Sequence, residues 1–81
     1  MKCVLRSNVF KNVFWGMINH NTIYEERWIV VKDRESVWQV LYWNSIKACN
    51  EYLKNYNIQN GEIVKLKDVK ELFDKIKGEN K

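Results

Sequence analysis

The chain has 81 residues, of which 46% are hydrophobic and 30% are charged. This length fits a single domain spanning residues 1–81, and the composition excludes the low hydrophobicity and high net charge of disordered chains. Proline is absent and glycine occurs only three times, which excludes a flexible linker between two domains. The formal net charge of +4 keeps nucleic-acid binding open as a function.

The N-terminal third has the least regular pattern. Residues 1–5 fit an edge strand, whereas residues 9–17 fit both the stripe of a helix and the alternation of a strand. Valine, phenylalanine, tryptophan and asparagine are mediocre or poor helix formers, so we expect extended structure in 9–17. Asn19, His20 and Asn21 then predict a loop.

Two apolar and aromatic segments, 23–31 and 37–43, predict a pair of antiparallel strands joined by residues 32–36. Alternation in the second strand places Trp38 on a face without charged residues, and we expect this face to form the core beneath the helices. The opposite face carries four residues: Val37, Gln39, Leu41 and Trp43. We expect segment 9–17 to cover this second face, or part of it to stay open for a partner, with Trp43 partly exposed.

Two amphipathic helices are predicted in the C-terminal half. Ser45 can cap the first helix, whose apolar residues recur at spacings of three and four. Asp68 and Glu71 resemble the capping box of the second helix, and Gly78 suits its C-terminal end. Residues 62–66 between the helices read as a short strand. The pattern predicts an α+β fold with a small, mainly antiparallel sheet of three to five strands and two amphipathic helices.

Residues that could support catalysis or hold a cofactor are sparse. His20 is the only histidine, Cys3 and Cys49 form no Cys-x-x-Cys pair, and the three glycines build no phosphate-binding loop. We therefore expect no enzymatic activity, no metal and no cofactor, and we expect reduced thiols.

The N-terminal residues lack the apolar core of a signal peptide, and no stretch approaches the roughly 20 apolar residues of a membrane span. These observations predict a cytoplasmic protein without a membrane partner. The abundance of lysine and asparagine favours a small protein of bacterial or phage origin.

The aromatic strand pair is the main functional candidate. Tryptophan and tyrosine are enriched at interface hot spots, so we expect a protein partner or a homo-oligomer. The candidate protein-binding residues are Val37, Gln39, Leu41 and Trp43.

The alternative is a weakly basic nucleic-acid-binding regulatory protein. Its candidate residues are Arg6, Lys11, Arg27, Lys32 and Arg34, provided that the fold brings them together. The charged residues of segment 67–75 are spaced for pairing at i and i+4, which is typical of a solvated helix face.

Overall fold

The chain folds into an antiparallel sheet with helices on both faces. The computed structural model describes residues 1–79, with side chains through residue 78. The strands are β1 (Cys3–Ser7), β2 (Val13–His20), β3 (Ile23–Val30), β4 (Tyr42–Trp43) and β5 (Gly61–Lys65), and the helices are α1 (Arg34–Gln39), α2 (Ile46–Asn55) and α3 (Leu66–Glu79). The predicted α+β class and the antiparallel sheet are confirmed, whereas α1 is an additional helix.

Strand β1 lies inside the sheet, so the expectation of an edge strand at residues 1–5 is wrong. β5 pairs with all five residues of β1. The other edge of β1 is shared by β4, opposite Cys3 and Val4, and by β2, opposite Arg6. Cys3, Val4 and Leu5 are completely buried. A continuous apolar run of this kind is typical of a strand that is covered on both faces.

Strands β2 and β3 form a hairpin with eight residue pairs, from Val13 and Val30 at its base to His20 and Ile23 at its tip. The extended structure expected in segment 9–17 is confirmed from Val13 onward. His20 was expected in a loop but is the last residue of β2, and the connection is only two residues long. Asn21 opens this connection with a φ of 61°, a left-handed conformation that asparagine tolerates well.

Residues 34–39 form helix α1, so the expectation of a strand across 37–43 is wrong except at β4. The helix begins at a capping box. The carboxylate of Asp33 accepts a hydrogen bond from Ser36 N at 2.8 Å, and Ser36 Oγ accepts one from Asp33 N at 3.0 Å. Hydrogen bonds from the backbone N–H and the side chain of Ser36 to the carboxylate also lower the pKa of Asp33. The cap satisfies backbone donors at the helix start, which outweighs the strand preference of Val37 and Trp38.

The two helices predicted from the sequence are present. Ser45 caps α2 as expected, with its hydroxyl accepting a hydrogen bond from Ala48 N at 3.1 Å. Helix α3 begins at Leu66, two residues before Asp68, directly after β5. It also continues through Gly78, which was expected to end it and which keeps a negative φ.

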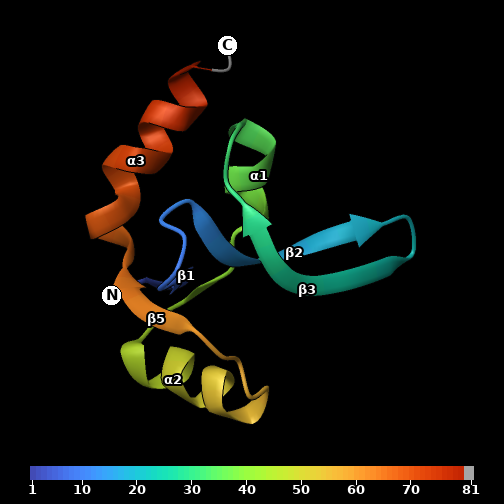
Figure 1. Cartoon of the computed structure of the whole chain (residues 1–81), viewed down its shortest axis with the longest axis vertical. Helices are drawn as coiled ribbons and strands as arrows, with labels where there is room; N and C mark the ends of the chain where they lie inside the picture. Colours follow the sequence, from blue (N-terminus) through green and yellow to red (C-terminus); the bar gives the residue numbers. More distant parts are fainter. Residues whose placement is uncertain (80–81) are drawn as a thin grey trace.

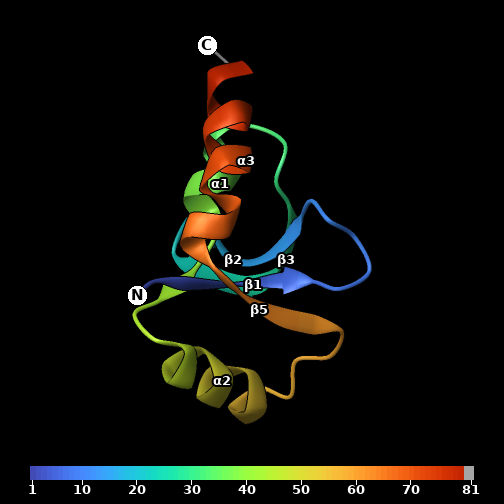
Figure 2. The same ribbon diagram turned by 90° about the vertical axis from the view of Figure 1, so that its left-hand side faces the viewer.

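The alternation of side chains along β1 separates two hydrophobic cores, one on each face of the sheet. α1 and α3 close the first core, which contains Val4, Phe14, Ile29, Val31, Val37, Val40, Val69, Phe73 and Ile76. α2 covers the second, in which Trp15, Trp28, Trp43, Tyr52, Leu53 and Ile63 pack around Cys3, Leu5, Cys49 and Ile58. Figures 1 and 2 show α2 on the opposite side of the sheet from α1 and α3. Both faces are therefore covered by helices, and residues 13–17 belong to the sheet itself.

Candidate functional site

The structure overturns the expected core position of Trp38 but leaves Trp43 partly exposed, as expected. Trp38 lies on α1 with 76% of its surface exposed, so its predicted core position is wrong. Trp43 is half-buried, and its ring centroid lies 4.9 Å from that of Tyr52 on α2. The physical reason is the helical period: α1 turns Val37 into the core and points the next residue toward solvent.

The four residues predicted to share an open face are separated in the structure. Val37 is buried in the first core, and Trp43 packs in the second. Gln39 lines a hollow between β3 and α1, and Leu41 is half-buried beside β2, where its N–H donates to Trp15 O at 3.1 Å. These four residues therefore form no common surface.

A groove between α1 and α3 is the most promising binding site in the described part of the chain. Its volume is about 390 Å³, and we call it the α1–α3 groove. Eight residues line it: Val37, Trp38, Tyr42, Leu66, Lys70, Phe73, Asp74 and Lys77. The five from α3 recur at spacings of one, three or four and so lie on one side of the helix. Two of the charged α3 residues that the sequence marked as solvated, Lys70 and Asp74, thus belong to one wall of a groove with an apolar floor.

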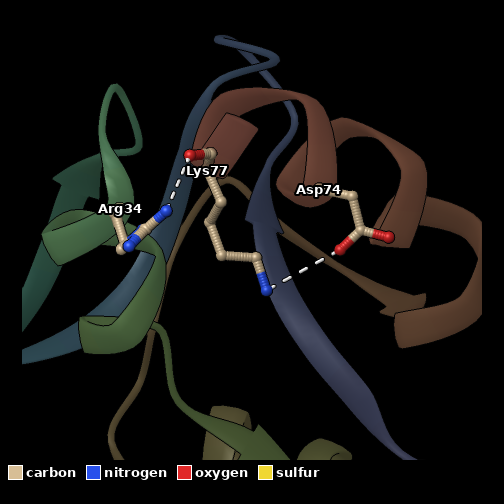
Figure 3. Close-up of polar contacts among 3 residues, drawn as sticks. All are labelled: Arg34, Asp74 and Lys77. Atoms are coloured by element: carbon tan, nitrogen blue, oxygen red, sulfur yellow. Dashed lines mark hydrogen bonds and ion pairs between the residues drawn. The ribbon is translucent and has the colours of Figure 1, made fainter. Parts of the chain in front are cut away.

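One end of the α1–α3 groove is closed by polar contacts (Figure 3). Arg34 Nη2 at the start of α1 donates to the backbone carbonyl of Lys77 near the end of α3, at 3.4 Å. Lys77 Nζ lies 3.7 Å from the carboxylate of Asp74. The guanidinium is well placed there, because carbonyls at a helix C-terminus carry partial negative charge. The contact from Arg34 joins α1 to α3, whereas the ion pair of Lys77 with Asp74 lies within α3.

The opposite end of the groove carries an aromatic ring beside a cation. Lys2 Nζ lies 5.4 Å from the centroid of the Tyr42 ring, and Tyr42 is 54% exposed. The carbonyl of Lys2 also accepts a hydrogen bond from Leu66 N at 2.8 Å, which fixes the position of the lysine. Among the lining residues, Lys70 and Lys77 against the carboxylate of Asp74 give a net charge of +1, and Lys2 and Arg34 contact the lining residues Tyr42 and Lys77.

The five basic residues of the nucleic-acid alternative lie in three separate places. Arg6 Nε donates to the carbonyl of Lys11 at 2.8 Å. Arg27 and Lys32 line the hollow between β3 and α1, whereas Arg34 reaches the end of α3. Carboxylates adjoin the second place: Glu25 pairs with Arg27 at 3.1 Å, and Asp33 and Glu35 line the same hollow. These five residues therefore form no continuous basic stripe.

Two side chains in the second core resist ionisation, the thiol of Cys49 and the hydroxyl of Tyr52. Cys3 and Cys49 are buried free thiols. Burial raises the pKa of Cys49 to about 11, and the neighbouring Cys3 adds to the shift. Burial also raises the pKa of Tyr52 to about 12, although a hydrogen bond from Trp15 Nε1 at 3.1 Å opposes the shift. Both side chains are therefore held in their neutral forms.

We expect the free energy of unfolding to fall as the pH rises from 9 to 11. The unfolded Cys49 thiol ionises near pH 9.0 and the folded one near 11. The contribution of Cys49 to the free energy of unfolding is therefore complete below pH 9 and is lost as the pH rises toward 11. The loss should be on the order of 1–2 kcal/mol by pH 10.5. Urea unfolding of the wild type and of Cys49→Ala at pH 8 and pH 10.5 measures it. Equal pH dependence in the two proteins would contradict this assignment.

Within residues 1–79, histidine, cysteine and carboxylate side chains form no group of three that could hold a metal ion. No helix in this part of the chain has both the length and the apolar character needed to cross a membrane. Comparison of the chain with protein-family models, curated proteins and solved structures gives no match. The functional argument therefore depends on the geometry of the α1–α3 groove.

Proposed function

We propose that the protein is a non-enzymatic protein-interaction module whose α1–α3 groove binds a segment of a partner protein. The observation that supports this proposal is Trp38, an indole 76% exposed beside a groove with an apolar floor. Tryptophan is the residue type most enriched in interface hot spots, and covering such a ring removes a large apolar surface from water. Tyr42 supplies a second exposed aromatic side chain at the same groove.

The dimensions and charge of the groove indicate what kind of segment fits. The α3 wall runs from Leu66 to Lys77, about 16 Å along a helix axis. That length accommodates about three turns of a partner helix. The net charge of +1 on the lining, with Lys2 and Arg34 beside it, favours a segment that combines apolar with acidic side chains, because opposite charges steer association and fix register.

Nucleic-acid binding is the second candidate. The observation in its favour is the pair of exposed rings, Trp38 and Tyr42, close to lysines, because bases stack on aromatic side chains between cationic groups. Asp74 lies in the same groove and opposes phosphate binding. We therefore rank this function below protein binding.

The test compares the wild type with Trp38→Ala. Peptides are selected from a phage-displayed random library on the immobilised wild-type protein, and their affinities are measured by fluorescence anisotropy. We expect the selected peptides to be rich in apolar and acidic residues and to bind Trp38→Ala at least tenfold more weakly, which is about 1.4 kcal/mol. The free energy of unfolding should change by no more than about 0.5 kcal/mol, because the ring is exposed.

Phe10→Ala is the matched control, since Phe10 is 65% exposed and lies outside the groove. It should bind the selected peptides as the wild type does. Equal peptide affinity of the wild type and Trp38→Ala would refute the groove as the binding site. Micromolar binding of a labelled single-stranded oligonucleotide at physiological salt, lost in Trp38→Ala, would favour the second candidate.

A further inference from the structure

Strand β3 is an edge of the sheet, and its outer side has the features of a pairing surface. The sheet order ends at β3, whose eight residues pair with β2 in an uninterrupted register. Natural edge strands of this length are usually blunted by a proline, a bulge, a covering element or charged side chains. The charged side chains of β3 are confined to Glu25, Glu26 and Arg27. β3 has no proline and no bulge, and Ile23, Tyr24 and Val30 are 58–67% exposed on it.

The tip half of the hairpin projects away from the helices (Figure 1). Every residue from Asn19 to Arg27 is exposed. A two-stranded ribbon is only marginally stable in water, and a third strand against its edge stabilises it. The projecting arm therefore gains stability from a partner strand on the free side of β3.

We propose that a second copy of this chain pairs with β3, in antiparallel orientation around a two-fold axis perpendicular to the sheet. Rotation about such an axis leaves each side chain on the same face of the sheet. Facing residues in an antiparallel pair also share a face, so one β3 residue must lie opposite the same residue of the other copy. Three charged residues, Glu25, Glu26 and Arg27, occupy the middle of the strand. Centring the axis on Glu25 or on Arg27 sets like charges opposite each other and forms no directly facing pair of opposite charges.

Centring the axis on Glu26 also sets a like charge opposite its own copy, but Glu25 of each copy then faces Arg27 of the other, in place of the ion pair that the two residues form within one strand. Opposite charges on facing strands stabilise a sheet, and this register forms two such contacts. The same register sets Tyr24 opposite Trp28, and Ile23 opposite Ile29. The Glu26 carboxylate also contributes to the raised pKa of Tyr52 on α2. The dimer surface is separate from the α1–α3 groove.

A charge exchange tests the register. Sedimentation equilibrium should show a reversible dimer of the wild type. Glu25→Arg places arginines opposite each other and Arg27→Glu places glutamates opposite each other, so each variant alone should dimerise at least about tenfold more weakly. An equimolar mixture of the two variants should dimerise as strongly as the wild type, because arginine faces glutamate at both contacts.

Two control variants separate this surface from other effects. Glu71→Arg makes the same charge change as Glu25→Arg on an exposed residue of α3, and it should leave dimerisation unchanged. Trp38→Ala should also dimerise normally, since its ring belongs to the groove. A wild-type monomer up to about 1 mM would overturn the proposal. It would also be overturned if both charge variants dimerised as strongly as the wild type, or if their mixture dimerised no more strongly than each variant alone.

Discussion

Replacing Phe14 with alanine should unfold most of the protein at 25 °C. Phe14 is completely buried on β2, where its ring meets that of Phe73 edge-on, with the centroids 5.0 Å apart. The guanidinium of Arg6 lies 5.5 Å from the same ring. Truncating a buried phenylalanine costs about 3–5 kcal/mol, and a core of this size typically supplies a similar amount.

Circular dichroism during thermal and urea unfolding measures this effect. Phe10→Ala is the natural comparison, because Phe10 lies four residues earlier and is 65% exposed. It should change the free energy of unfolding by no more than about 0.5 kcal/mol. A loss below about 1 kcal/mol for Phe14→Ala would show that the ring is not packed as the structure places it.

Adding a single methyl group at Gly16 should destabilise the fold by about 2–3 kcal/mol, because the site has no room for it. A Cβ there would lie 2.5 Å from the carbonyl oxygen of Gln39 and 2.6 Å from Ile29 Cδ1. The contact with Gln39 is to backbone, which no side-chain rotation relieves. The end of α1 rests directly on β2 here, and Gly16 also forms a bridge with Val40. Gly16→Ala therefore pushes α1 away from the sheet.

Gly78→Ala is the matched control. Gly78 lies within α3, and a Cβ there meets nothing within 4 Å. Alanine is the better helix former, so this variant should equal the wild type or gain up to about 1 kcal/mol. Urea unfolding of both variants at 25 °C makes the comparison. If Gly16→Ala proved as stable as Gly78→Ala, the close contact between α1 and β2 would be disproved.

The helices α2 and α3 were predictable because cap residues and apolar stripes agree over ten or more residues. Helix α1 was not, since its six residues are too few to show a period of 3.6. The alternation from Val37 to Trp43 resembles that of a strand. The signal that identifies the helix is the Asp33 and Ser36 spacing of a capping box, which contains serine where the usual motif has glutamate or glutamine.

The candidate site depended on that short helix. The concentration of tryptophans correctly drew attention to segment 22–43, but the strand reading pointed to Trp43 and its neighbours. Because residues 34–39 form a helix, the exposed indole is that of Trp38, and it lies beside α3, more than 25 residues later in the chain. Such a contact depends on how β4, α2 and β5 return the chain to β1, and no local pattern encodes that path.

The central position of β1 has a consequence for how the molecule acquires its fold. Its main partner, β5, begins at Gly61, 58 residues after Cys3. At ordinary rates of protein synthesis this strand follows β1 by roughly 3–12 s. During that interval the β2 and β3 hairpin can close locally, but Cys3, Val4 and Leu5 lack the strand that pairs along the whole length of β1. Because pairings between segments far apart in the chain form slowly, we expect the pairing of β1 with β5 to form late in folding.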